Sequence, residues 1–137
     1  VVFRHNPLDH HCNPRVDKPF HPFACGAARA AVCAEEQGAF WPMHDALFAN
    51  QTQLGEDRLL AYGAELGLGR DELASCMNSA QATHRISADL AVAKEVGVRG
   101  TPSLFLNRRK VPGGAVGYER LAAAVEAEVK ACGGAGN

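Results

Sequence analysis

The sequence lacks a long hydrophobic run, a dominant charge of one sign and any internal repeat, and each absence excludes a class of protein. No apolar stretch approaches the ~18 residues that a membrane-spanning helix needs. The formal net charge is −1 and no basic stripe is present to neutralise phosphates, so nucleic acid is not an expected partner. With 137 residues, 47% of them hydrophobic, the chain suits one globular domain over 1–137.

Cysteine is plentiful, but no two cysteines are separated by two residues, the spacing of redox-active pairs. The closest two are Cys25 and Cys33, with seven residues between them. Five cysteines in so short a chain indicate an oxidising compartment. The odd number leaves at least one thiol free or paired with another chain, and Cys132, beside glycines at the end of the last helix, is the exposed candidate.

The N-terminal part of the sequence predicts a strand followed by a long loop. Val1–His5 reads as a short buried strand, because two β-branched residues precede Phe3. The next segment, Asn6–Pro22, holds four prolines and three of the six histidines. Four prolines in 17 residues exclude regular structure there.

Five helices are predicted in the middle of the chain from alanine content and apolar residues spaced three to four apart. They cover Phe23–Gln37, Phe40–Asn50, Glu56–Leu66, Arg70–Asn78 and Gln81–Val96. After the fifth helix, the spacing of apolar residues changes from the helical period to the two-residue period of strands. Ser103–Leu106 is a compact strand, Asn107–Lys110 a polar turn, Val111–Val116 a second strand and Tyr118–Ala131 a final amphipathic helix.

Four stretches of the sequence carry a family resemblance, and they occur in the family's order. They are VVFRHNPL at the N-terminus, AAVCAEEQGAFWPMHDALFANQ from Ala30, LAYGAELGLGRDELASCMNS from Leu60 and VGVRGTPSLFLNRRKVPGG from Val96. Together they resemble the DsbA-like thioredoxin family of exported thiol–disulfide oxidoreductases. The resemblance implies an α/β, thioredoxin-like fold with a helical insertion, here at about residues 23–96.

Gly100, Thr101 and Pro102 match the family's cis-proline loop. The resemblance implies a cis bond before Pro102 and a substrate-binding backbone that takes a peptide like an added strand. On spacing alone, Thr101-Pro102 would rather indicate an ordinary trans turn before a strand, and the flanking match reverses that preference.

The resemblance is incomplete at the N-terminal end. The family begins with a strand and a helix that starts with Cys-x-x-Cys, where the helix terminus stabilises a thiolate. Val1–His5 matches the strand after that helix, so the first strand and first helix are missing here. No residue is assigned a catalytic role and no cofactor is expected. We expect a piece cut from a longer chain, the alternative being removal of a leader.

In a thioredoxin fold the missing first strand would lie between two others, here Val1–His5 and Ser103–Leu106. Its absence would leave two edges with unpaired backbone groups. We expect these two segments to pair directly, or a second chain to close the edge in a homodimer. Cleavage that left the first strand out of this chain is the third alternative.

Two cysteine pairs are candidates for structural disulfides. Cys33 and Cys76 fall in stretches that match the family's insertion, where some relatives carry a structural disulfide, and the alternative is two buried thiols. Cys12 and Cys25 flank the proline-rich loop, which has few apolar residues to hold it, so a disulfide would stabilise it.

Zinc and free thiols are the alternatives for the second pair. Candidate zinc ligands are His10, His11, Cys12, His21 and Cys25. Their spacing fits no common zinc motif, and two cysteines in an exported domain more often oxidise, so no metal site is expected.

Three functions are compatible with the sequence. The first is the substrate-binding and structural part of a protein thiol–disulfide oxidoreductase whose Cys-x-x-Cys is not in this chain. The second is a redox-inactive peptide-binding module of the same fold, and the third a glutathione-dependent isomerase or transferase of the superfamily. The resemblance implies unfolded or reduced proteins as partners, a membrane redox partner of the parent protein as a further candidate, and a periplasmic or otherwise exported location.

Overall fold

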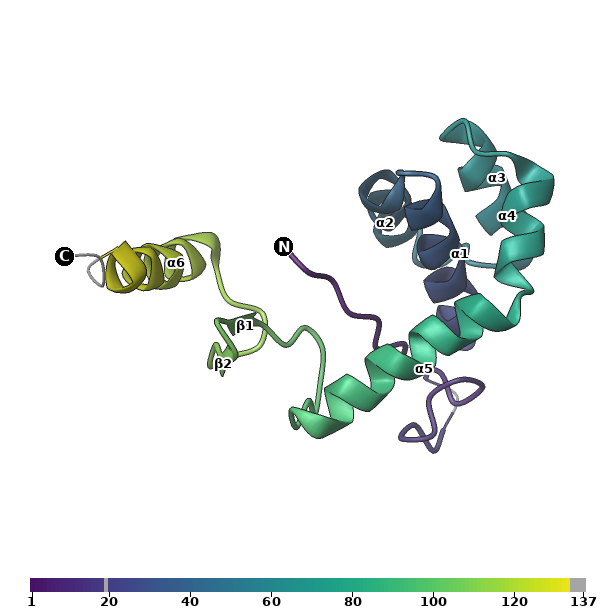
Figure 1. Ribbon diagram of the computed structural model, residues 1–137. Helices are drawn as coiled ribbons and strands as arrows, with labels where there is room; N and C mark the ends of the chain where they lie inside the picture. The colour runs from purple at the N-terminus through teal and green to yellow at the C-terminus, as the bar shows by residue number, and fades with distance from the viewer. Residues whose placement is uncertain (19, 134–137) are drawn as a thin grey trace. The chain divides into compact units, whose positions relative to one another are not determined.

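The computed structural model describes residues 1–18 and 20–133 and contains mainly helices (Figure 1). Its elements are α1 (Ala24–Glu36), α2 (Phe40–Ala49), α3 (Glu56–Glu65), α4 (Arg70–Met77), α5 (Ala80–Glu95), β1 (Phe105–Leu106), β2 (Arg109–Lys110) and α6 (Tyr118–Gly133). Every helix begins and ends within about two residues of the prediction from its apolar periodicity. None of the described helices is both long and apolar enough to cross a membrane.

The chain divides into two compact units, Val1–Glu95 and Val96–Asn137. The first contains α1 to α5, and the second contains the two strands and α6. The expectation of a single domain over 1–137 stays a prediction.

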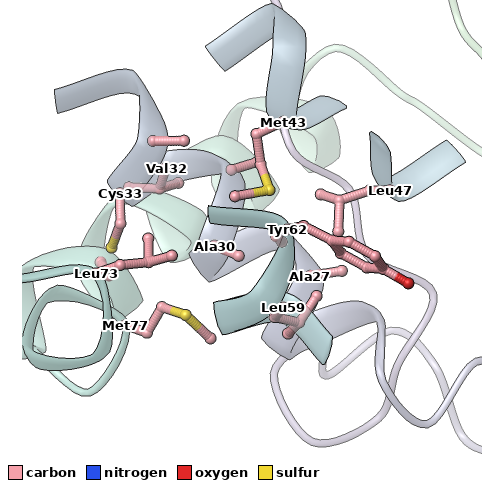
Figure 2. Packing of buried hydrophobic residues seen from close by; sticks show 14 of the residues in the cluster. Ala27, Ala30, Val32, Cys33, Met43, Leu47, Leu59, Tyr62, Leu73 and Met77 are labelled. Atoms are coloured by element: carbon pink, nitrogen blue, oxygen red, sulfur yellow. The ribbon is translucent and has the colours of Figure 1, made fainter. Parts of the chain in front are cut away.

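Helix α1 lies at the centre of the first unit and contacts α2, α3, α4 and α5. Its alanine-rich sequence explains this position, because methyl side chains such as Ala30 and Ala34, both fully buried, let neighbouring helices approach closely. Larger side chains from the other helices fill the core around it, as Figure 2 shows. The bulkiest of those that are fully buried are Met43, Leu59 and Leu73.

Two glycines set the packing of the helices that follow. Gly38 has φ +72°, and the N–H groups of Gly38 and Ala39 donate to carbonyls in the last turn of α1, which ends that helix and begins α2. Gly63 on α3 lies against the side chain of Leu73 on α4, and a Cβ at this position would overlap Leu73. A larger residue at position 63 would therefore force the buried side chain of Leu73 to shift.

The prediction of a strand at Val1–His5 is wrong, since this segment has no regular secondary structure. The described sheet consists of β1 and β2 alone. Val1–His5 and Ser103–Leu106 belong to different units, so their direct pairing, like the homodimer, stays a prediction. The segment is held by a side chain of α5: Asp89 accepts hydrogen bonds from the His5 N–H (2.9 Å) and from Arg4 Nη1 (2.8 Å). Hydrogen bonds to the Asp89 carboxylate thus hold this segment, where the sequence alone suggested backbone pairing with a neighbouring strand.

In the second unit, β1 and β2 form an antiparallel hairpin with Phe105 opposite Lys110 and Leu106 opposite Arg109. Asn107 and Arg108 make the turn with φ of +45° and +68°, the conformation that a two-residue hairpin favours. The prediction of a second strand at Val111–Val116 is wrong. The turn is shorter than expected, so the strand starts earlier, and Pro112 has no N–H to extend the ladder.

Candidate functional site

The loop predicted to bind substrate, Gly100–Pro102, precedes β1 in the second unit. The Thr101–Pro102 peptide bond is cis, as the sequence match implied. All three residues are exposed, and Ser103 Oγ donates to the Gly100 carbonyl at 2.7 Å. Within the described residues no protein group accepts a hydrogen bond from the Thr101 N–H. The substrate-binding role of the loop stays a prediction.

Two surface hollows of the first unit, with volumes of about 500 and 300 Å³, are lined by residues outside this loop. The larger lies beside Cys76 and is lined by Glu36, Asp71, Glu72 and Ser75 among others. Neither hollow is therefore a candidate site for the peptide expected beside Pro102.

Both predicted disulfides are present. Cys33, almost fully buried on α1, is bonded to Cys76 on α4 with an S–S distance of 2.05 Å. Cys12, in the proline-rich loop, is bonded to Cys25 in the first turn of α1 at 2.07 Å. The fifth cysteine, Cys132 on α6, is exposed and carries a free thiol.

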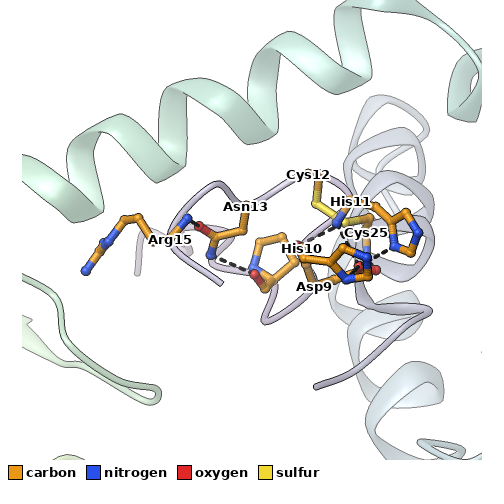
Figure 3. The surroundings of a disulfide bond; sticks show 8 residues. Asp9, His10, His11, Cys12, Asn13, Arg15 and Cys25 are labelled. Atoms are coloured by element: carbon orange, nitrogen blue, oxygen red, sulfur yellow. Dashed lines mark hydrogen bonds and ion pairs between the residues drawn. A yellow bond between two sulfur atoms is a disulfide. The ribbon is translucent and has the colours of Figure 1, made fainter. Parts of the chain in front are cut away.

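The Cys12–Cys25 bond excludes the zinc site that would have used both sulfurs as thiolates, because each sulfur is bonded to the other. It also excludes the alternative of two free thiols at these positions. Figure 3 shows that the surroundings of this disulfide are polar, with Asp9, His10, His11 and Asn13 lying around it.

Asp9 organises this part of the loop and was missed by the sequence reasoning. It is 1% exposed, and its carboxylate accepts hydrogen bonds from the Cys25 N–H (3.1 Å) and the His11 N–H (3.0 Å) (Figure 3). Asp9 Oδ1 also lies 2.7 Å from His11 Nδ1. Burial alone would raise the pKa of Asp9, but the hydrogen bonds from His11 and Cys25 outweigh it and lower that pKa below its ordinary value.

A buried histidine, His5, lies where the N-terminal segment meets α5, and its backbone N–H donates to Asp89. Burial lowers the pKa of His5, and the nearby negative charge of Asp89 opposes that shift in part. The imidazole packs between aromatic rings, with centroids 5.2 Å from Phe3 and 6.0 Å from Phe40. This arrangement anchors the segment and contains no accessible nucleophile.

Comparison with known proteins places these features in a family context. A family model described as DSBA-like thioredoxin domain matches residues 20–126. A solved structure, a thioredoxin-like oxidoreductase from Silicibacter pomeroyi DSS-3, aligns with a TM-score of 0.63 and 28% sequence identity, covering 81% of this chain and 64% of that one.

The curated relatives are much longer proteins. The chain is 40% identical over 124 residues to the Na(+)/H(+) antiporter NhaA 3 of Salinispora tropica. This match covers 90% of this chain and 18% of that protein. It is 38% identical over 95 residues to the Na(+)/H(+) antiporter NhaA of Herminiimonas arsenicoxydans, and this match covers 69% of this chain and 15% of that protein. The chain thus spans less than a fifth of the length of these relatives.

Proposed function

The chain belongs to the family of DSBA-like thioredoxin domains, and from this membership we propose that it is the peptide-binding and structural part of a protein thiol–disulfide oxidoreductase. Its substrates are reduced or unfolded exported proteins, and the redox Cys-x-x-Cys comes from outside these residues. The two disulfides support an oxidising, periplasmic or otherwise exported location, because such bonds persist where thiols are not kept reduced.

The observation that carries this proposal is the exposed residue Thr101, whose N–H donates to no described protein group. An extended peptide that joins a protein as an added strand needs main-chain donors and acceptors that are not already used. Thr101 is an exposed residue shortly before the two-stranded hairpin of the same unit, and no described protein group accepts a hydrogen bond from its N–H. Binding through the main chain also suits a protein that must accept many sequences, because every peptide carries the same backbone groups.

Peptide binding at this loop tests the proposal. We expect a fluorescently labelled, reduced and unfolded cysteine-containing peptide to bind the chain. Thr101→Arg keeps the backbone N–H, but its long charged side chain should obstruct the approach of the peptide and weaken binding about tenfold, as disturbing roughly one hydrogen bond would. Fluorescence anisotropy measures the affinity, and Glu119→Gln, an exposed change on α6, is the control and should bind as the unmodified chain does. Equal affinity of the Thr101→Arg and Glu119→Gln variants, or no binding at all, would contradict the proposal.

A second candidate function follows from the curated relatives, which are named Na(+)/H(+) antiporters. We propose as the alternative that this chain is a thioredoxin-like module within a longer antiporter-like polypeptide. An antibody raised against residues 1–137 should then detect, in cells that carry the gene, a membrane-bound polypeptide several times longer than the chain. Detection solely of an unattached exported protein of about this length would contradict the alternative and leave the first proposal in place.

A further inference from the structure

We propose that Asp9, His10 and His11 form a binding site for one divalent late-transition-metal ion, with Zn²⁺ as the representative. We call these three residues the Asp9–His11 cluster. It lies beside the Cys12–Cys25 disulfide and uses neither sulfur (Figure 3). The site consists of residues of the first unit alone and does not depend on the function proposed above.

The positions of the three side chains suit a shared ion. Each residue offers one ligand atom, and these atoms all lie within 4.8 Å of one another. Asp9 Oδ1 lies 2.7 Å from His11 Nδ1 and 3.8 Å from His10 Nδ1. Ligand atoms about 2.1 Å from a tetrahedral zinc are separated by about 3.4 Å, a value between these two distances. Small rotations of the two rings therefore suffice to form the site.

The carboxylate is held in place before any ion binds. Asp9 is buried, and the N–H groups of Cys25 and His11 both donate to it, so its oxygens have fixed positions. Such hydrogen bonds to a ligating carboxylate orient it and increase metal affinity.

The two histidines supply access for the ion. Their side chains are 38% and 61% exposed for His10 and His11, and their ring centroids are 4.0 Å apart. An ion can thus enter from solvent, and water can fill the coordination positions that three protein ligands leave open. Two imidazoles with one carboxylate favour zinc, copper or nickel over magnesium or calcium, which prefer oxygen ligands alone.

The experiment uses the 137-residue chain without an affinity tag, with both disulfides intact and with metals removed by a chelator. Isothermal titration with ZnCl₂ near pH 7.5 should show one ion bound per chain. His10→Ala and His11→Ala should each weaken binding at least about tenfold, as loss of a metal ligand or its orienting partner does. His21→Ala is the matched control, since His21 is exposed in the same loop but lies outside the cluster, and its affinity should not change.

Thermal unfolding gives an independent measure. An ion that binds the folded state but not the unfolded state raises the melting temperature. Zinc should therefore raise the melting temperature of the unmodified chain and of His21→Ala. It should not raise that of the double variant His10→Ala/His11→Ala. Both histidines are exposed, so these variants should fold, which circular dichroism without zinc checks.

Three results would overturn the proposal. Unchanged zinc affinity in the His10 and His11 variants would show that zinc binds elsewhere. Loss of affinity in His21→Ala would assign a different ligand set. Binding that appears only after a phosphine reductant opens the Cys12–Cys25 bond would show that thiolates, and not the Asp9–His11 cluster, hold the ion.

Discussion

Replacing both Cys33 and Cys76 with serine is expected to lower the free energy of unfolding by about 4 kcal/mol. The two cysteines are 43 residues apart, and the disulfide between them restricts the unfolded chain over that whole interval. The bond also joins α1, the central helix of the first unit, to α4. Its loss should therefore loosen the packing around Cys33, which is only 1% exposed.

Urea denaturation followed by circular dichroism measures this change, and Cys132→Ser serves as the control. Cys132 is exposed and forms no disulfide, so its replacement should shift the unfolding free energy by less than about 0.5 kcal/mol. A double variant of Cys33 and Cys76 with the same unfolding midpoint as Cys132→Ser would show that this disulfide does not stabilise the helical unit.

Asp89→Ala is expected to destabilise the first unit by about 3 kcal/mol. The carboxylate is fully buried and accepts hydrogen bonds from the His5 N–H and from Arg4, and it has no substitute in the variant. The His5 N–H would then be buried without a partner, while the half-exposed Arg4 can turn into solvent. Removing Asp89 should also release Phe3 from its contact with Phe40, because the N-terminal segment loses its attachment to α5.

Asp45→Ala is the matched control, because it removes a carboxylate whose side chain is 79% exposed on α2. Its expected effect is less than about 0.5 kcal/mol. Hydrogen exchange of the His5 amide separates the two variants further, since it should accelerate in Asp89→Ala and stay slow in Asp45→Ala. Protection of that amide in Asp89→Ala would mean that another group holds the segment.

The sequence predicted the helices well because each carries its own signal. Alanine content and apolar residues three to four apart mark α1 to α6, and glycines such as Gly38 and Gly67 mark where two of them end. The strands were predicted poorly because a strand depends on a partner that local sequence does not specify. Val1–His5 has the composition of a buried strand, yet it is attached to a helix through Asp89.

The candidate sites show the same contrast between features that a sequence pattern marks and features that depend on the folded chain. The resemblance to DsbA-like thioredoxin domains, confirmed by the family match over residues 20–126, placed the loop at Pro102 and the Cys33–Cys76 pair. The roles of Asp9 and Asp89 were missed, since each acts through groups that only the folded chain brings close. Asp89 and His5 are 84 residues apart in sequence, and no periodicity connects them.

The attachment of His5 to Asp89 also fixes where the polypeptide enters and leaves the helical unit. Asp89 lies six residues before Glu95, the last residue of α5, a distance of about 9 Å along a helix. The chain therefore arrives and departs at nearly the same place on α5. A helical unit whose two ends lie close together can be inserted between two parts of another fold without moving those parts away from each other. This is the condition under which domain insertion is tolerated.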